Sequence, residues 1–500
     1  MITILTTTDE CKKINEYITS IDRLDELVSV SEAAHNEFPV RLKIAENQIQ
    51  SLMDWQDTIP PYVFPCVALT RENLLALVFF HLGNHQRAFE FLEEKQSLYV
   101  HLLIATSLQF GYVVSDEAVS AVQDSANYCF VNHYGNTETQ MNYETLCKAY
   151  EEAIQQGEKS LVRTPTMSTE VSAFLSKHYG NLLLDANDFK KAEQHLRSQL
   201  RKDLPEPAQI ALKSQLASAL VGRLQFPYQE TELNTIAELQ NECLAYFEAQ
   251  NEPVKEGLLS LEAAEIAGFK ADFIQAKELL NKAILNFKKE DIPELLGEAS
   301  LRKAALLYNW SKNGSPQYYK PAINAYQDTL KVFKRHSHPE KFAEIHHNLA
   351  LIYSEIPAAA HEKAIWTAFC ASSFKEALSV YQKETHPYQF AMTCHNYATA
   401  LMNFPEAKLH SNLDKAYGLF EDALQIRTAK DYPFERALTL TNQLELLWLK
   451  HNETAQEEEE NHELMLQKAH EIKTLVDDPR LIKKADEQIV ALEKLKPILT

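Results

Sequence analysis

The sequence predicts an all-α protein in which pairs of helices stack in a row. Three observations predict it: glycine is scarce, one short motif recurs, and small residues recur at fixed steps after a proline. Glycine accounts for only 11 of the 500 residues. Chains rich in hairpins need glycine in their turns, so this scarcity favours helices throughout.

The recurring motif is clearest in the C-terminal half. The stretches "HPEKFAEIHHNLALIY", "HPYQFAMTCHNYATAL" and "YPFERALTLTNQLELL" begin at His338, His386 and Tyr432. Alanine follows each proline by four residues, and a small residue usually follows seven residues further on. The same step can be followed upstream, with proline spacings of 46, 40, 46, 48 and 46 residues, through Pro207, Pro253, Pro293, Pro339, Pro387 and Pro433. Self-similarity at such a period indicates a solenoid.

Each repeat predicts two helices, A and B. Proline suits the first turn of helix A, where its missing N–H costs nothing. Apolar residues then follow at i, i+4, i+7 and i+11, which is one face of an α-helix. Small residues on the same helix allow a neighbouring helix to approach closely. In the third copy the pattern comprises Phe390, Cys394, Tyr397 and Leu401 in helix A, and Ala416, Phe420, Ala423 and Leu424 in helix B.

Three regions follow from this pattern. Residues 71–450 are predicted to form the repeat array, with fainter copies in "LLALVFFHLGNHQRAFEFLEE" from Leu74 and "HYGNLLLDANDFKKAEQHL" from His178. Residues 1–70 show no convincing repeat, and we expect an N-terminal helical cap there. Residues 451–500 are predicted to hold an acidic loop, with a frayed helix start as the alternative for the acidic run, followed by capping helices, because the end of a solenoid must be polar on its outer side.

Charge narrows the class of partner. The formal net charge is −21, which repels nucleic acid phosphates and anionic membranes, so neither is an expected partner. The acidity is accounted for by a solvated helical surface or, as a sharper alternative, by a basic protein partner. Seven scattered cysteines without a CxxC pair suit a reducing compartment. The N-terminus lacks the apolar core of a signal peptide, so we expect a cytoplasmic protein.

The repeats resemble the tetratricopeptide repeat. Helix A of that family carries a leucine, a small residue and then an aromatic residue, as in the run Asn348–Tyr353, and helix B carries the spacing of Ala416, Phe420 and Ala423. The resemblance covers roughly residues 70–450 and implies a right-handed superhelix of about eight to ten antiparallel helix pairs. The period exceeds the family's usual ~34 residues. It resembles long-repeat variants found in kinesin light chains and in bacterial proteins beside a caspase-like CHAT protease.

What the resemblance implies for function is binding of a protein or an extended peptide in a concave groove lined by helix A. Asn348, Asn396 and Asn442 each lie nine residues after a proline, beside the core face. A carboxamide donates and accepts, so it can hold a peptide backbone. The alternative is an asparagine bonded to the neighbouring repeat. We also place Arg302, His347, His395 and Trp448 in the groove.

Further upstream, His178 and Asn181 are candidates for the same groove, with a packing histidine as the alternative. Glu344 and His347 form an E-x-x-H, but a di-iron site needs a second such pair and two more glutamates. No nucleotide-binding or hydrolase motif occurs, so we expect neither a cofactor, nor a metal, nor catalysis.

We therefore expect a non-catalytic adaptor or scaffold. The alternative is a regulatory or sensor subunit that controls a partner enzyme, such as a CHAT-type protease, by conformational change. The sequence does not specify the oligomeric state.

Overall fold

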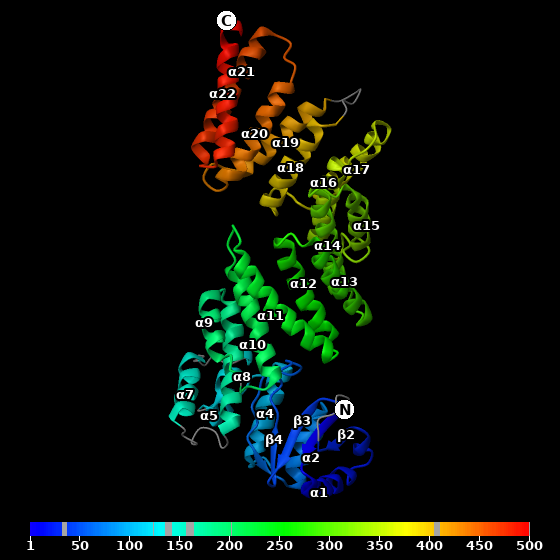
Figure 1. Ribbon diagram of the computed structural model, residues 1–500, viewed down its shortest axis with the longest axis vertical. Coiled ribbons are helices and arrows are strands. Elements are labelled where there is room, and N and C mark those ends of the chain that lie inside the picture. Colours follow the sequence, from blue (N-terminus) through cyan, green and yellow to red (C-terminus); the bar gives the residue numbers. More distant parts are fainter. Residues whose placement is uncertain are drawn as a thin grey trace. The chain divides into compact units, whose positions relative to one another are not determined.

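A computed structural model describes residues 1–32, 38–123, 125–135, 143–156, 165–201, 203–404 and 411–499 (Figure 1). Two compact units divide the chain, Met1–Lys255 and Glu256–Thr500. Helices dominate both units, and within each unit many consecutive helices pack against one another. The all-α repeat prediction is therefore confirmed for the array, which has the paired-helix organisation of a tetratricopeptide-like solenoid.

The N-terminal segment corrects the predicted helical cap, because it forms a five-stranded sheet of strand order β2-β1-β3-β4-β5. Strand β1 pairs in parallel with β2 and β3, whereas β4 and β5 are antiparallel additions. The elements are β1 (Ile2–Thr6), α1 (Thr8–Thr19), a 3-10 turn (Leu24–Glu26), β2 (Val28–Ser31), β3 (Val40–Ala45), β4 (Gln48–Ser51) and β5 (Val67–Ala68).

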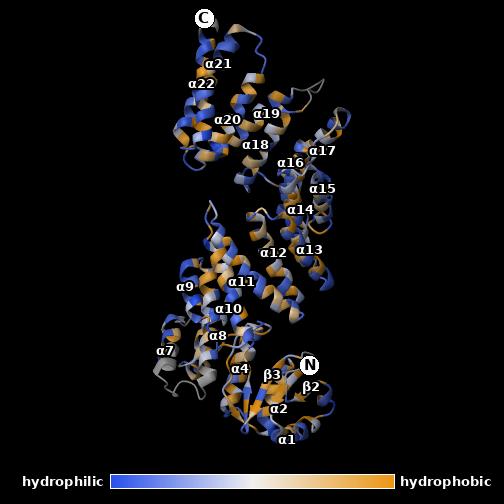
Figure 2. Ribbon diagram, viewed as in Figure 1, coloured by the Kyte–Doolittle hydropathy of each residue, from blue (hydrophilic) through white to orange (hydrophobic). Residues whose placement is uncertain are grey.

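The scarcity of glycine did not exclude this sheet. The β3–β4 hairpin turns through Glu46 and Asn47, which adopt positive φ angles of 54° and 57° without being glycine. Asparagine tolerates the left-handed region better than most residues, and the Asn47 N–H also donates to the Glu10 carboxylate. Alternating apolar residues such as Leu42 and Ile44 are buried against α1. Figure 2 shows hydrophobic residues gathered in this part of the chain.

Helices fill the rest of the first unit. Helix α2 follows the sheet directly and is buried along most of its length, from Leu74 to Phe80. Helices α8, α9, α10 and α11 then pack in sequence, each against the next. The helices of this unit are α2 (Arg71–His81), α3 (His85–Phe89), α4 (Ser97–Phe110), α5 (Asp116–Ala121), α6 (Ala126–Tyr134), α7 (Tyr143–Gln156), α8 (Pro165–Asp185), α9 (Phe189–Gln199), α10 (Glu206–Arg223) and α11 (Glu230–Ala249).

The second unit contains the five clearest repeats. Their A helices are α12, α14, α16, α18 and α20, and each begins at the proline that the motif predicts. The helices are α12 (Pro253–Phe269), α13 (Phe273–Lys289), α14 (Pro293–Lys312), α15 (Tyr319–Thr329), α16 (Pro339–Glu355), α17 (Ala360–Leu378), α18 (Pro387–Met402), α19 (Asn412–Ile426), α20 (Pro433–Leu449), α21 (Ala455–Leu475) and α22 (Pro479–Leu499), with a 3-10 turn at Pro316–Tyr318.

In the first three of these repeats, the small residue four positions after the proline packs against an aromatic ring from the end of the same repeat. A Cβ placed on Gly257 would lie 2.7 Å from the Phe287 ring, and one placed on Gly297 would lie 2.8 Å from the Phe333 ring. In the next repeat Ala343 lies in one cluster with Tyr381. The paired helices therefore approach too closely for a larger side chain at this step.

In the C-terminal region the acidic run begins α21, so a helix start describes it and the predicted acidic loop is corrected. The Thr454 hydroxyl accepts a hydrogen bond from the Glu457 N–H at 3.2 Å, and the Glu457 carboxylate accepts one from the Thr454 N–H at 3.2 Å. This reciprocal capping box, together with acidic residues in the first turn, stabilises the start of a helix. Helix α22 then packs on α21 and α20.

Replacing either of the two glycines in α12 by alanine should change the free energy of unfolding, in opposite directions at the two positions. Gly268→Ala should raise the free energy of unfolding by about 0.5 kcal/mol, because alanine is the better helix former and no atom lies within 4 Å of its added Cβ. Gly257→Ala should lower it by about 1 kcal/mol or more, since overpacking against Phe287 outweighs that gain. Urea midpoints measured by circular dichroism test both, and shifts of the same sign would contradict the packing argument.

Candidate functional site

One stripe of accessible side chains runs across the A helices of the second unit. It comprises the residues five, nine, twelve and sixteen positions after the first proline of α12, α14, α16, α18 and α20. These residues are Leu258, Glu262, Glu265, Phe269, Glu298, Arg302, Ala305, Asn309, Glu344, Asn348, Leu351, Glu355, Met392, Asn396, Thr399, Asn403, Leu438, Asn442, Glu445 and Leu449. Steps of three and four residues fall on one side of an α-helix. All of these residues are described, and each is half-buried or exposed. We call this stripe the A-face.

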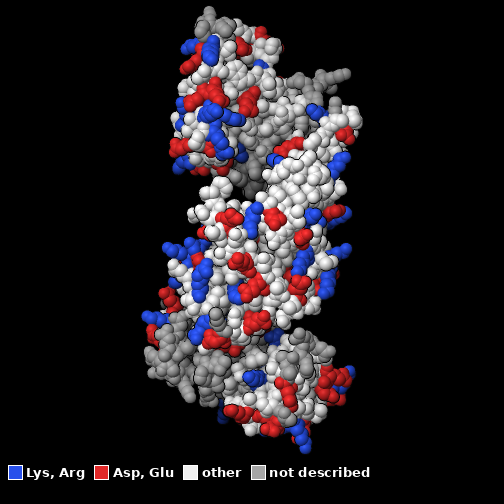
Figure 3. Space-filling view, in the orientation of Figure 1, with Lys and Arg blue, Asp and Glu red and all other residues white. Residues whose placement is uncertain are grey.

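Charge on the A-face is strongly acidic. Six of its residues are acidic and one, Arg302, is basic. Arg302 is itself paired, with its Nε 3.2 Å from Glu298 and its Nη1 3.7 Å from Glu265. Over the face drawn in Figure 3, acidic and basic side chains are interspersed. The acidic members are Glu262, Glu265, Glu298, Glu344, Glu355 and Glu445.

His347 links two consecutive A helices. Its ring is buried in α16, with Nδ1 3.0 Å from the Thr393 hydroxyl and Nε2 3.1 Å from the Asn396 amide nitrogen on α18. An amide nitrogen only donates, so Nε2 accepts and the ring proton lies on Nδ1. Burial lowers the pKa of His347 to about 4, which keeps the ring neutral.

His395 repeats this arrangement one helix further on. Its Nδ1 lies 3.2 Å from the Thr439 hydroxyl, and its Nε2 lies 3.4 Å from the Asn442 amide nitrogen on α20. The same amide nitrogen donates to Thr399 at 3.0 Å. Burial and the nearby Arg427 charge lower the pKa of His395 to about 3. We call these two arrangements the His–Asn bridges.

The bridges correct the expected roles of both histidines. His347 and His395 hold neighbouring A helices together rather than presenting free ring nitrogens to a partner. The amide nitrogens of Asn396 and Asn442 are engaged in the same bridges. The alternative interpretation, an asparagine bonded to the neighbouring repeat, therefore describes these two residues.

Asn348 differs from the other two asparagines. The preceding A helix, α14, carries Leu301 at the step that His347 and His395 occupy later, so it offers no ring nitrogen. Asn348 is half-buried, and its side chain forms no hydrogen bond with any residue in the described ranges. Both the donor and the acceptor of this carboxamide therefore remain available on the A-face.

Trp448 lies on α20, one step away from the A-face. Its side chain is 40% exposed, and the indole N–H donates to the Gln488 carboxamide on α22. The contact joins the last A helix to the terminal helix.

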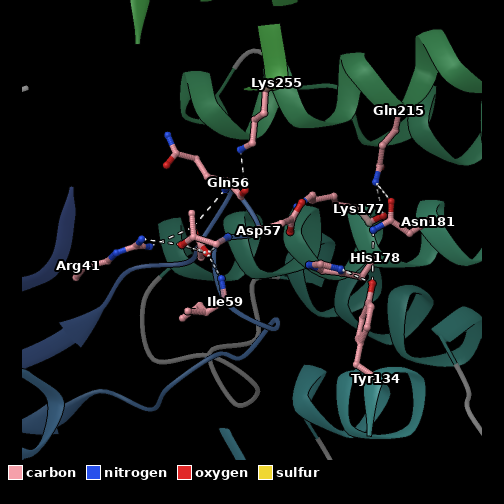
Figure 4. Close-up of polar contacts among 12 residues, drawn as sticks. Arg41, Gln56, Asp57, Ile59, Tyr134, Lys177, His178, Asn181, Gln215 and Lys255 are labelled. Carbon is pink, nitrogen blue, oxygen red and sulfur yellow. Dashed lines mark hydrogen bonds and ion pairs between the residues drawn. The ribbon is translucent and has the colours of Figure 1, made fainter. Parts of the chain in front are cut away.

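The upstream candidates separate in the structure. His178 is buried in α8, where its ring packs against Phe130 and Phe174 with ring centroids 5.1 and 4.8 Å away. Its Nδ1 lies 2.9 Å from the Tyr134 hydroxyl (Figure 4). His178 is therefore a packing histidine, which corrects its placement in the groove. Asn181 is half-buried one turn on, and its amide lies 3.5 Å from the same hydroxyl.

A cluster of lysine residues beside His178 was not predicted from the sequence. The loop after β4 reaches α8 and places the Asp57 carboxylate against the Lys177 ammonium (Figure 4). The Lys177 side chain is 4% exposed, whereas that of Asp57 is 53% exposed. Burial lowers the pKa of Lys177. Lys255 donates to the Gln56 carbonyl of the same loop at 2.6 Å. The feature of the sequence that could have indicated this cluster is the position of Lys177 inside the apolar run of α8.

The described residues include neither a group of side chains that could hold a metal ion nor a helix that could cross a membrane. Among its residues, no group of three or more histidine, cysteine, aspartate or glutamate side chains is arranged to hold a metal ion, so Glu344 and His347 lack further ligands. In the same ranges no helix is both long and apolar enough to cross a membrane.

No protein-family model matches the chain, and no curated protein matches it significantly. Solved structures with a similar helical arrangement include a signal-transduction ATPase with a tetratricopeptide repeat sensor from Pyrococcus horikoshii, at 14% identity and a TM-score of 0.47. That match covers 83% of this chain and 57% of the other.

Two further structures are comparably distant. Yeast Tom70 is 13% identical, with coverage of 86% and 90% and a TM-score of 0.37. Human IFIT1, solved as a dimer with m7Gppp-AAAA, is 17% identical, with coverage of 85% and 90% and a TM-score of 0.36. Likenesses at this distance assign no function to this chain.

The bridges predict a loss of stability in acid. Because the folded pKa values of His347 and His395 lie below the ordinary 6.5, the unfolded chain binds more protons between pH 6.5 and about 4, so stability falls as the pH falls. Each histidine should contribute about 2 kcal/mol of this loss between pH 7 and pH 5. Urea unfolding of the wild type and of a His347→Gln/His395→Gln variant measures it, and equal pH slopes would refute the assignment.

The buried lysine predicts an asymmetry between two substitutions. Asp57→Asn should cost roughly 2 kcal/mol of stability, because it removes the carboxylate that contacts the buried Lys177 ammonium. Lys177→Met should cost within about 1 kcal/mol, because the half-exposed Asp57 remains solvated. Asparagine also tolerates the φ of 55° at this position. Thermal unfolding of both variants compares them, and the opposite order would show that the ammonium is not dependent on Asp57.

Proposed function

We propose that the chain is a non-catalytic adaptor or scaffold that holds an extended segment of a partner protein along the A-face. The observation that carries the proposal is the continuity of this stripe over five A helices without a buried side chain. Each of the A helices α14, α16 and α18 contacts the next A helix, up to α20, so the spacing of the stripe is fixed before a partner binds. A pre-formed surface loses less conformational freedom on binding.

Asn348 is the residue that we assign to the partner's backbone. Its carboxamide can donate to a carbonyl and accept from an N–H, which reads an extended backbone without selecting side chains. Asn396 and Asn442 contribute differently, because their amide nitrogens are engaged in the His–Asn bridges. They keep the A-face in shape, and a partner reaches them through their remaining oxygen atoms.

The charge of the A-face supports a basic partner. Six acidic residues against one paired arginine leave an excess of negative charge along the stripe. Such a surface attracts a lysine-rich or arginine-rich segment and repels phosphate backbones. Binding between exposed charges is screened by salt, so the proposed interaction weakens as ionic strength rises.

Affinity capture from native lysate tests the proposal with a matched pair of variants. Asn348→Ala removes the free carboxamide, whereas Asn281→Ala changes an exposed asparagine on α13, outside the A-face. We expect at least a fivefold loss of the captured partner with Asn348→Ala and none with Asn281→Ala, at unchanged helicity and melting temperature. Quantitative mass spectrometry at 0.1 and 0.5 M salt measures both effects (about 10 and 4 Å of screening length). Equal capture by both variants would reject the A-face as the site.

A further inference from the structure

Two A helices carry, near their ends, an aromatic side chain whose hydrogen-bond donor contacts a later helix. Fifteen residues after its proline, α14 carries Tyr308, whose hydroxyl donates to Glu355 on α16 at 2.7 Å. At the same step α20 carries Trp448, whose indole donates to Gln488 on α22. The chain thus uses one device twice: an aromatic ring near the end of an A helix, with its polar end bonded to a later helix.

Helix α12 lacks this side chain. Gly268 stands at the same step, and no atom lies within 4 Å of the position that its Cβ would take. Across from it Ala305 on α14 stands where α16 carries Leu351, so the facing helix does not fill the space either. A cavity of about 440 Å³ results, with an apolar floor that includes Leu261, Phe273, Leu280 and Leu306.

A polar residue that could accept the hydrogen bond is nevertheless present on the facing helix. Asn309 lines the cavity at the step on α14 that Glu355 occupies on α16. Its side chain is exposed and forms no hydrogen bond with any described residue, so its oxygen is available as an acceptor. Glu265 and Arg302 of the A-face lie on the rim of the same cavity. The cavity therefore opens onto the surface assigned to the partner.

We propose that this cavity receives a tyrosine side chain of the partner, flanked by basic residues. The ring occupies the place that Tyr308 takes in the next repeat, and its hydroxyl donates to the Asn309 carboxamide as Tyr308 donates to Glu355. Burial of the ring in the apolar floor supplies the attraction, and the hydroxyl orients it. The acidic A-face supplies the complement for neighbouring lysine or arginine residues. This inference rests on the proposed function and names the chemistry of its partner.

A side-chain mimic tests the cavity without the partner. The probe is p-cresol, which has the ring and hydroxyl of tyrosine, and toluene is the control that lacks only the hydroxyl. Titration into the full chain, followed by methyl nuclear magnetic resonance, should shift the methyl signals of Leu261, Ala305 and Leu306 with p-cresol. Toluene should bind at least fivefold more weakly. Absence of these shifts, or equal affinity of the two probes, would overturn the proposal in favour of an empty or purely apolar cavity.

Two variants complete the experiment. Ala305→Leu introduces the residue that α16 carries at this step, so it should occupy the part of the cavity that the ring would take, fold normally and abolish p-cresol binding. Asn309→Leu should reduce the affinity for p-cresol to that for toluene. Unchanged p-cresol binding in either variant would overturn the assignment.

Asn348→Ala separates this proposal from the proposed function. It lies outside the cavity and should leave p-cresol binding unchanged while weakening the partner. A partner that is lost with Asn348→Ala but retained fully by Ala305→Leu would support the A-face and reject the tyrosine pocket.

Discussion

Close approach between the two helices of each repeat is the constraint on which the C-terminal unit depends. Gly257 and Gly297 lie so near Phe287 and Phe333 that a single added carbon would contact the ring. This contact fixes the rotation of α12 and α14 about their axes. Once the small residues face inward, the steps at five, nine, twelve and sixteen must face outward. The A-face is therefore a consequence of packing, and its accessibility follows from the same glycine and alanine positions that hold the pairs together.

Polar contacts then divide the A-face into two parts. From α16 to α20 the His–Asn bridges join neighbouring helices through neutral rings, buried at His347 and half-buried at His395. From α12 to α16 this device is missing, because α14 carries Leu301 where a histidine would stand. Unengaged carboxamides, at Asn309 and Asn348, occur in this second part, and Asn309 lines the cavity together with Arg302. The bridged part acts as a stiff support, and the unbridged part carries the groups that can bind.

The sequence predicted the helices of the array more accurately than the residues of the candidate site. The prolines marked the starts of the A helices because a missing N–H and small neighbours leave a clear periodic signal. The β3–β4 hairpin left no such signal, since Glu46 and Asn47 adopt the turn without glycine. The acidic run before His462 looked like a loop because its capping box depends on Thr454, one residue in a charged stretch. The burial of His178 and the pairing of His347 with Asn396 depend on neighbours about 45 to 50 residues away, which spacing alone does not specify.

Hydrogen exchange measured on the full chain with and without its captured partner tests the central claim most directly, because it locates the contact helix by helix. If the A-face is the working surface, protection on binding should concentrate on α12, α14 and α16 and leave α13, α15 and α17 unchanged. Protection confined to α13, α15 and α17, or to the sheet of the first unit, would contradict it.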